Sequence, residues 1–243
     1  MSNIEVSALR YSTFLVPCSI FSPQPVQYMT ITLSQLVPTP LKERLLPRHS
    51  DVWNNHFTIE QGTFIKLKAP SGSGKTTLVH IVYKLREDYT GSVTFDGTPV
   101  REITGDVLAD FRQQQLSIVF QDLRLFPNLT ARENIELNRV LQEPYYESSM
   151  IDTMAEQLGI THVLQQTAGI CSYGEQQRVA IIRALMQPFS WLILDEPFSH
   201  LDKTNTRKAA ELIAAECRKR NAGMLITDLD DDEHFSYNRQ YQL

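Results

Sequence analysis

The stretch Ala-Pro-Ser-Gly-Ser-Gly-Lys-Thr, residues 69–76, decides how the whole chain is interpreted. Its small central residues allow consecutive backbone N–H groups to converge on phosphate oxygens. A helix that begins at Lys75 adds its positive N-terminal end, and the Lys75 side chain adds a full charge for the outer phosphates. The hydroxyl of Thr76 suits a Mg²⁺ ion that bridges those phosphates. We therefore expect a nucleoside triphosphate to be bound by Pro70, Ser71, Gly72, Ser73, Gly74, Lys75, Thr76 and Thr77.

The flanks of this stretch have the pattern that a phosphate-binding loop requires. Residues 64–68 read as a strand before it, and residues 77–84 read as a helix after it. Ala69 replaces the usual first glycine of such a loop, which is a mild departure. The strand, loop and helix together favour nucleotide binding over a chance match.

Length and composition are those of a globular protein with one large domain or two small ones. The chain has 243 residues, 42% hydrophobic and 21% charged, and a formal net charge of −5. This charge gives no electrostatic footprint for nucleic acid, so we expect no nucleic-acid partner. Cys18, Cys171 and Cys217 have neither metal-ligand spacing nor the density of a disulfide scaffold. Reduced thiols and a cytoplasmic location are the expectation.

The N-terminal region is expected to lie outside the folded domain. Its apolar residues 11–21 are interrupted by Pro17 and have no basic leading segment, which argues against a secretory signal. No apolar run in the sequence reaches the ~20 residues of a membrane-spanning helix. We expect residues 1–28 to be a poorly ordered extension and residues 29–243 to form a single domain.

The first half of that domain is rich in expected strands. Residues 57–59 and 64–67 read as strands on either side of a turn, and residues 91–97 read as a hairpin with Asp96-Gly97 as its turn. The character then becomes helical over residues 122–171, which we expect to form an inserted helical subdomain.

The second half alternates between helix and strand. The expected elements are helices at 130–142, 148–158, 174–186 and 203–220, and strands at 191–194 and 223–227. Alternation after residue 172 predicts an α/β fold with a parallel sheet flanked by helices. Residues 29–121 and 172–243 would then form one core, interrupted by the helical subdomain.

Two acids follow a buried-strand pattern in Trp-Leu-Ile-Leu-Asp-Glu-Pro, residues 191–197. Both carboxylates are expected at the carboxyl edge of the sheet, where open α/β sheets bind ligands. Asp195 would hold Mg²⁺ through its water shell, and Glu196 would orient or deprotonate the water that attacks the terminal phosphate. The alternative for such a pair is a solvated turn or a helix cap, but the preceding phosphate loop favours the catalytic interpretation.

The stretch Cys-Ser-Tyr-Gly-Glu-Gln-Gln-Arg, residues 171–178, discriminates between families. Ser172 is a good N-cap for the following helix, and capping is compatible with phosphate binding because both use the same exposed helix start. The stretch resembles the signature motif of ATP-binding-cassette (ABC) ATPases, and the resemblance covers nearly all of residues 30–243. It implies a P-loop NTPase core of RecA-like type, with an N-terminal antiparallel β subdomain and an inserted α-helical subdomain.

The resemblance also implies partners and further site residues. Ser172, Gly174 and Glu175 would meet the nucleotide of a second cassette in a head-to-tail homodimer or heterodimer. Gln121 matches the glutamine loop, which senses Mg²⁺ and the attacking water, and Asp202 matches the aspartate of a loop that signals across the dimer. Residues 123–135 resemble the segment that receives a membrane permease, although Leu125, Phe126 and Leu129 there are equally suited to packing.

Three departures from the family pattern bear on activity. Cys171 and Tyr173 replace the usual leucine and first glycine of the signature. Asp228 stands where the family has a switch histidine, and an ionised carboxylate would repel the terminal phosphate, so we expect slow hydrolysis. His234 is expected to be a surface histidine beyond that loop. Residues 38–51 lack the aromatic residue that usually stacks on adenine; His49 and Trp53 are the candidates, with a core position as the alternative for Trp53.

The sequence thus predicts an ATP-binding and ATP-hydrolysing subunit of an ABC transporter, with ATP and Mg²⁺ as ligands. Residues 120–134 resemble cassettes that partner lipoprotein-releasing or macrolide-export permeases. The subunit would lie in the cytoplasm, peripheral on the inner face of the cell membrane. The alternatives are a degenerate cassette that forms the regulatory half of a heterodimer, and a soluble ABC ATPase outside transport.

Overall fold

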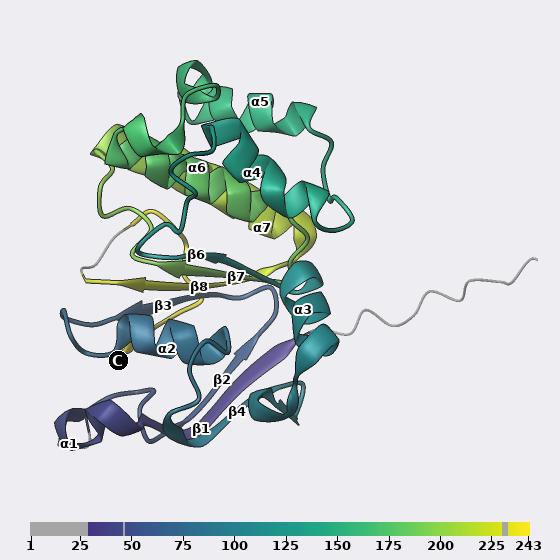
Figure 1. The fold of residues 1–243 in the computed structure, drawn as a ribbon. Coiled ribbons are helices and arrows are strands. Elements are labelled where there is room, and N and C mark those ends of the chain that lie inside the picture. The colour runs from purple at the N-terminus through teal and green to yellow at the C-terminus, as the bar shows by residue number, and fades with distance from the viewer. Residues whose placement is uncertain (1–28, 46, 230–232) are drawn as a thin grey trace, which may run out of the picture.

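The structure, a computed structural model, describes residues 29–45, 47–229 and 233–243. The extension expected over residues 1–28, with Cys18, lies outside the described residues. Two sheets form the framework of the fold (Figure 1). One is antiparallel and the other is parallel.

The antiparallel sheet has the strand order β2-β1-β4-β5. Its strands are β1 (Thr30–Pro38), β2 (His56–Glu60), β4 (Tyr89–Phe95) and β5 (Thr98–Pro99). Asp96 and Gly97 connect β4 to its antiparallel partner β5, which confirms the expected hairpin. Short helices η1 (Thr39–Leu41) and α1 (Lys42–Leu45) follow β1.

The parallel sheet has the strand order β6-β7-β8-β3-β9, and every pairing in it is parallel, as the alternating pattern predicted. Its strands are β3 (Phe64–Lys68), β6 (Leu116–Val119), β7 (Trp191–Asp195), β8 (Gly223–Asp228) and β9 (Arg239–Gln242). Every residue of β7 is buried, as expected for a central strand covered on both faces. Gly223 permits the close pairing with β7, because a β-carbon there would lie 2.6 Å from the Trp191 ring.

Helices cover both faces of the parallel sheet (Figure 1). Helix α2 (Lys75–Val82) lies between the two sheets, and its apolar residues share a core with both. On the opposite face lie α4 (Ala131–Val140), α5 (Ser149–Gln157), α6 (Tyr173–Leu185) and α7 (Lys203–Arg220), which form a second core with the sheet. These four helices fall within two residues of their expected bounds.

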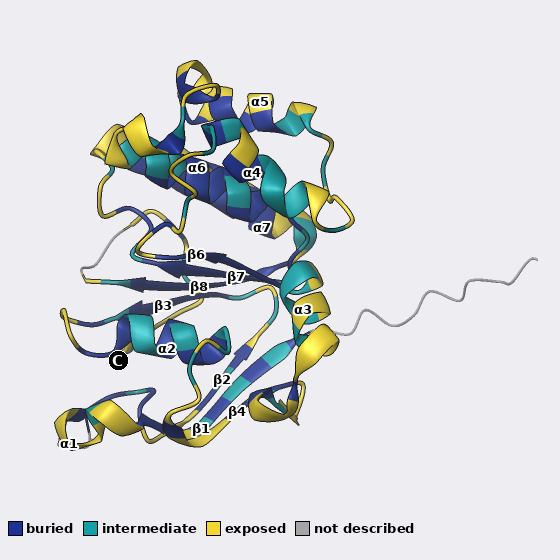
Figure 2. Cartoon of the chain, in the orientation of Figure 1, coloured by how far each residue is buried: buried dark blue, intermediate teal, exposed yellow. Residues whose placement is uncertain are grey.

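Several elements were missing from the prediction, among them α1 and the 3-10 helices. Helix α3 (Gly105–Gln114) occupies part of the region expected to be strand-rich, and β9 extends the sheet beyond β3. Figure 2 shows that α3 carries exposed and intermediate residues, in contrast to the largely buried strands β3, β6, β7 and β8. Short 3-10 helices η2 (Val100–Glu102), η3 (Thr161–Val163) and η4 (Ala168–Ile170) complete the fold. Within the residues that the structure describes, no helix is long and apolar enough to cross a membrane.

Candidate functional site

The predicted chemical groups meet at one edge of the parallel sheet. Neighbouring strands β6, β7, β8 and β3 end, respectively, just before Gln121, at Asp195, at Asp228 and before the loop 69–74. Because the strands are parallel, their carboxyl ends lie side by side at this edge. Residues from distant parts of the sequence are thereby brought to a single site.

The loop leaves the start of α2 open. Gly74 precedes α2 with φ 101°, a left-handed conformation that glycine adopts without steric cost, and no side chain caps the helix. The Trp53 indole supports the loop from behind, because Nε1 donates to the Ser73 carbonyl oxygen at 3.2 Å. The first backbone N–H groups of α2 remain available for an anion.

Lys75 and Glu196 form a largely buried ion pair at this site. Nζ of Lys75 lies 3.2 Å from Oε1 of Glu196, and the two side chains are 4% and 12% exposed. The ammonium group also donates to the carbonyl oxygens of Ala69 at 2.7 Å and Pro70 at 3.3 Å. A phosphate ligand would therefore compete with Glu196 for the lysine charge.

Gln121 links this ion pair to the helix start. Its Nε2 donates to Oε2 of Glu196 at 3.0 Å, and its Oε1 accepts from Oγ1 of Thr76 at 3.1 Å. Thr76, Gln121, Glu196 and Lys75 thus form a continuous chain of polar contacts around one pocket.

Asp195 is completely buried and only half satisfied. Its Oδ1 accepts a hydrogen bond from Oγ1 of Thr227 at 2.6 Å. Its Oδ2 is buried and, among the described residues, has no hydrogen-bond partner. A carboxylate oxygen left in this way fits a divalent cation with its water shell, and the Thr76 hydroxyl and the Gln121 amide oxygen are further oxygen donors of the kind that Mg²⁺ prefers.

Glu196 is held in an unusual backbone conformation. Its φ is 48°, in the left-handed region that non-glycine residues rarely adopt. The backbone N–H donates to the Thr227 carbonyl oxygen at 3.0 Å, and Nε2 of Gln177 donates to the Glu196 carbonyl oxygen at 3.4 Å. Strands β7 and β8 and helix α6 together fix this conformation, which aims the carboxylate at Lys75.

The signature stretch begins α6 with reciprocal contacts between Ser172 and Glu175. Oε2 of Glu175 accepts from the Ser172 backbone N–H at 2.8 Å and from its hydroxyl at 2.7 Å. Oε1 lies 3.0 Å from Nε2 of His162. The hydrogen bond from the Ser172 hydroxyl, followed by those from its backbone and from His162, lowers the pKa of Glu175 despite partial burial.

The two departures in the signature occupy different surroundings. Cys171 is buried, whereas Tyr173 is 45% exposed and meets the His200 ring edge-on with centroids 4.1 Å apart. Gly174 lies against the next loop, since a β-carbon there would be 3.0 Å from the His200 carbonyl oxygen. The exposed Tyr173 ring therefore stands at the rim of the helix start.

Asp228 adjoins the phosphate loop through the backbone. Its carbonyl oxygen accepts from the Ala69 N–H at 3.1 Å, and its Oδ1 accepts from the Leu229 N–H at 2.7 Å. His234 is exposed, as expected, and its ring meets Phe198 edge-on at 5.6 Å between centroids.

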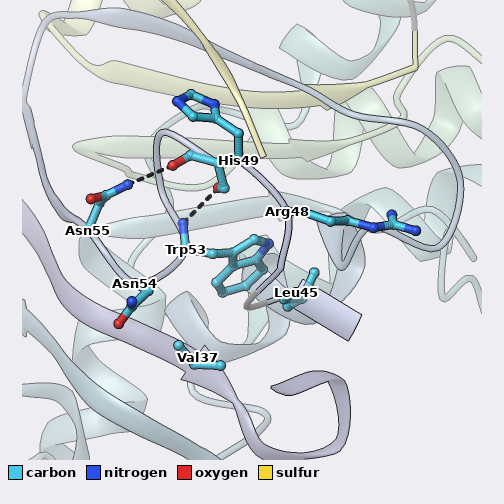
Figure 3. A pocket seen from close by; sticks show the side chains of 8 residues that line it. Val37, Leu45, Arg48, His49, Trp53, Asn54 and Asn55 are labelled. Atoms are coloured by element: carbon cyan, nitrogen blue, oxygen red, sulfur yellow. Dashed lines mark hydrogen bonds between the residues drawn. The ribbon is translucent and has the colours of Figure 1, made fainter. Parts of the chain in front are cut away.

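Two of the pockets near the loop bear on where a nucleotide would lie. The phosphate pocket, of about 240 Å³, is lined by Leu41, Arg44, Ser71, Gly72, Gly74, Lys75, Thr76, Thr77, Gln121 and Glu196. The second, the tryptophan pocket, has about 300 Å³ and is lined by Val37, Leu45, Arg48, His49, Ser50, Trp53, Asn54 and Asn55 (Figure 3). Both adenine candidates, His49 and Trp53, line the second pocket and neither lines the first. Trp53 is 4% exposed and is a core residue.

Several contributors to the site were missed from the sequence. Thr227 holds Asp195, and Leu41 and Arg44 line the phosphate pocket. The contact between Thr227 and Asp195 could have been predicted from the sequence, because the expected parallel pairing of β7 and β8 places these two residues opposite each other. Leu41 and Arg44 had none, because their position depends on how the segment after β1 folds.

Comparisons with known proteins are consistent with this geometry. A family model described as ABC transporter matches residues 52–199. The ABC transporter ATP-binding protein YxdL of Bacillus subtilis is 36% identical, over 65% of this chain and 62% of that protein. The lipoprotein-releasing system ATP-binding protein LolD of Geobacter metallireducens is 34% identical, over 70% of this chain and 77% of that protein.

A solved structure described as a dimeric bacterial ABC transporter cassette, MJ0796, is 26% identical. It superposes with a TM-score of 0.69 and covers 82% of this chain and 88% of that one. A second structure of the same protein, with TM-score 0.68, is described as a post-hydrolysis state bound to ADP and Pi.

Proposed function

Because this chain belongs to the ABC transporter family, we propose that it binds and hydrolyses ATP and drives a separate membrane permease. The observation that carries the proposal is the chain of contacts from Thr76 through Gln121 and Glu196 to Lys75 beside an open phosphate loop. It joins a phosphate-binding cation, a metal-binding hydroxyl and a general base in one pocket.

Each residue of that chain has a role in hydrolysis. Phosphate oxygens would replace Glu196 as the partner of Lys75, and the N–H groups of the loop would bind the same oxygens. Released from Lys75, the Glu196 carboxylate would orient the attacking water and accept its proton, while Gln121 would hold that water through its amide. Mg²⁺, held by Thr76, Gln121 and Asp195, would supply charge neutralisation for the phosphates when bound.

We propose that two such cassettes pair around ATP. Ser172, Gly174 and Glu175 would face the nucleotide of the partner cassette, because they lie at the start of α6, where Ser172 is exposed. The dimeric form described for MJ0796 supports this arrangement. The nucleotide-binding core would comprise residues 29–121 and 172–243, and residues 122–171 would form the helical subdomain.

The permease would dock on exposed apolar residues of that subdomain. Phe126 and Ile170 are 56% and 74% exposed. Their segments are joined by a hydrogen bond from the Gly169 N–H to the Pro127 carbonyl oxygen at 3.0 Å. Leu125, in contrast, packs against the core. We call Phe126 and Ile170 the docking face; contact through it would place the protein on the inner face of the membrane.

Asp228 supports a slow reaction. Its carboxylate belongs to the strand end between Asp195 and the phosphate loop, where a negative charge disfavours the charge that develops on the terminal phosphate. The same substitution favours one alternative, in which the chain is the regulatory half of a heterodimer and its partner hydrolyses ATP.

Hydrolysis by the purified full chain tests the proposal. Glu196→Gln is expected to lower turnover by about a hundredfold or more, the size expected for loss of a general base, while ATP still binds. Lys75→Ala is expected to lose binding. Glu102→Gln, an exposed glutamate on η2, is the matched control and should behave as wild type. Normal turnover in Glu196→Gln would remove the catalytic assignment, and a wild-type chain that binds no ATP would remove the proposed function.

A further inference from the structure

The segment after β1 places two side chains against the phosphate loop. A β-carbon on Gly74 would lie 3.3 Å from Cδ1 of Leu41, and one on Gly72 would lie 2.9 Å from Nη2 and 3.2 Å from Nη1 of Arg44. Both side chains line the phosphate pocket together with Lys75 and Thr76. An apolar and a cationic group therefore form the wall that faces the loop.

The Arg44 guanidinium is an unpaired cation among the residues that the structure describes. Within the described part of the chain, it donates no hydrogen bond and forms no ion pair. The carboxylate that lines the same pocket, Glu196, is already engaged by Lys75 and Gln121. A guanidinium offers a planar fork of N–H donors whose geometry matches two phosphate oxygens. Its position beside Gly72 puts these donors at the rim of the loop that cradles phosphate.

We propose that Arg44 is a second phosphate-binding cation of this site and that Leu41 takes the place of the missing aromatic residue beside the base. The proposal rests on the nucleotide-binding function proposed above. Leu41 offers an apolar contact but no ring to stack on and no donor or acceptor for base edges. The nucleotide is then held chiefly through its phosphates, and ATP and GTP bind with similar affinity.

Arg48 provides a matched control. It is an exposed arginine four positions after Arg44, but it lines the tryptophan pocket (Figure 3) and not the phosphate pocket. Arg44→Gln and Arg48→Gln therefore remove the same charge from the same segment. A long-range effect of charge would appear in both variants, whereas a direct phosphate contact appears in one.

The experiment is calorimetric titration of the full chain with ATP, GTP and inorganic tripolyphosphate at constant Mg²⁺ and ionic strength. Arg44→Gln is expected to weaken all three ligands by the same factor, about tenfold, as for one charge-assisted contact. Arg48→Gln should stay within about twofold of wild type. Leu41→Tyr, which restores an aromatic ring, should tighten ATP by about threefold and leave tripolyphosphate unchanged.

Three outcomes would overturn the proposal. Arg44→Gln that matches Arg48→Gln would show that Arg44 contacts no ligand. If Arg44→Gln changes the ratio of the ATP and GTP affinities but leaves the tripolyphosphate affinity unchanged, Arg44 contacts the base and not the phosphates. A wild-type chain that prefers ATP strongly over GTP would exclude Leu41 as the sole neighbour of the base. If wild type binds none of the three ligands, the proposed function itself fails, and the inference fails with it.

Discussion

At the scale of single residues, the ion pair between Lys75 and Glu196 determines what a phosphate ligand meets. Nζ of Lys75 and Oε1 of Glu196 are 3.2 Å apart in a largely buried pair, so the two charges attract each other and a ligand would have to displace the carboxylate from the lysine. Under the proposed function, phosphate binding would therefore release the Glu196 carboxylate to act as the general base.

Replacement of Glu196 by glutamine should tighten ATP binding. The neutral amide no longer competes for Lys75, and it removes a negative charge near the terminal phosphate, so we expect affinity to rise by about three- to tenfold. Titration of Glu196→Gln with ATP and Mg²⁺ measures this change, with Glu102→Gln as control. Equal or weaker affinity would show that the ion pair does not oppose the ligand.

Asp228 is expected to limit turnover through its charge. Asp228→Asn removes the repulsion and should raise turnover by a few-fold, and Asp228→His, which also supplies a hydrogen-bond donor, should raise it by about tenfold. Steady-state phosphate release at saturating ATP compares both with wild type. Unchanged rates in both variants would show that Asp228 does not act on the reacting phosphate.

Glu175 should make stability depend on pH in the acid range. Its pKa is lowered in the folded state, chiefly by the Ser172 hydroxyl, so its contribution is present above its unfolded pKa near 4.3 and is lost as pH falls through the folded value. Urea unfolding at pH 7 and pH 3.5 should therefore show that Glu175→Gln lowers the free energy of unfolding, relative to wild type, by more at pH 7 than at pH 3.5. An equal loss of stability at both pH values would show that the shape of the Glu175 side chain, and not its charge, stabilises the fold.

At the scale of elements, α6 governs the loop that carries Gln121. Leu123 and Arg124 have φ of 58° and 47°, two successive left-handed residues that the chain would not adopt alone. Arg183 of α6 donates to their carbonyl oxygens at 2.6 Å and 2.7 Å. Burial lowers the pKa of Arg183 to about 10, so the cation still holds the loop at neutral pH.

Loss of Arg183 should therefore impair catalysis more than binding. Arg183→Met is expected to lower kcat by about tenfold with little change in KM, because Gln121 loses its fixed position, and Arg183→Lys should recover part of the rate. Hydrogen exchange over residues 121–125 should be faster in Arg183→Met. Arg207→Met, which changes an exposed arginine of α7, is the control. Slower turnover without faster exchange would separate Arg183 from the loop.

The elements that sequence predicted share a strong physical signal. The phosphate loop has fixed spacing, and β7 and α6 have continuous or periodic apolar residues that must be buried. Helix α3 contains no buried residue, and β9 is a short, mostly exposed edge strand, so neither leaves such a pattern. Arg44 could not be assigned, because its contact with Gly72 depends on the turn between β1 and α1.

At the scale of the whole molecule, two hydrophobic cores lie on opposite faces of the parallel sheet and support different parts of the protein. One joins α2 and both sheets behind the phosphate loop, and the other joins the sheet to α4–α7. Helix α6 begins at Tyr173, directly after its N-cap Ser172. It holds the loop that carries Gln121 through Arg183, and it packs against α4 and α5. A change at a bound nucleotide would thus reach the helical layer through a packed element with fixed contacts.

The docking face is the surface through which that change would be passed to the permease. Phe126→Ser and Ile170→Ser remove apolar area that is already exposed, so the fold and basal hydrolysis should be unaffected. When the tagged chain is purified in mild detergent from the membranes of its own cell, a multi-spanning permease is expected to co-purify with the wild-type protein. Either variant should reduce the permease signal by about fivefold or more, as for a central interface residue.

Val107→Ser is the matched control for this experiment. Val107 is 65% exposed on α3, in a different layer of the fold, and its loss should leave the permease signal unchanged. Equal recovery with Phe126→Ser and Val107→Ser would place the docking face elsewhere. Recovery of soluble proteins alone by wild type would contradict a transporter motor. Recovery of a second cassette without a permease would favour the alternative in which this chain is the regulatory half of a heterodimer. In that arrangement the partner cassette hydrolyses ATP, and this chain needs no direct contact with a membrane protein.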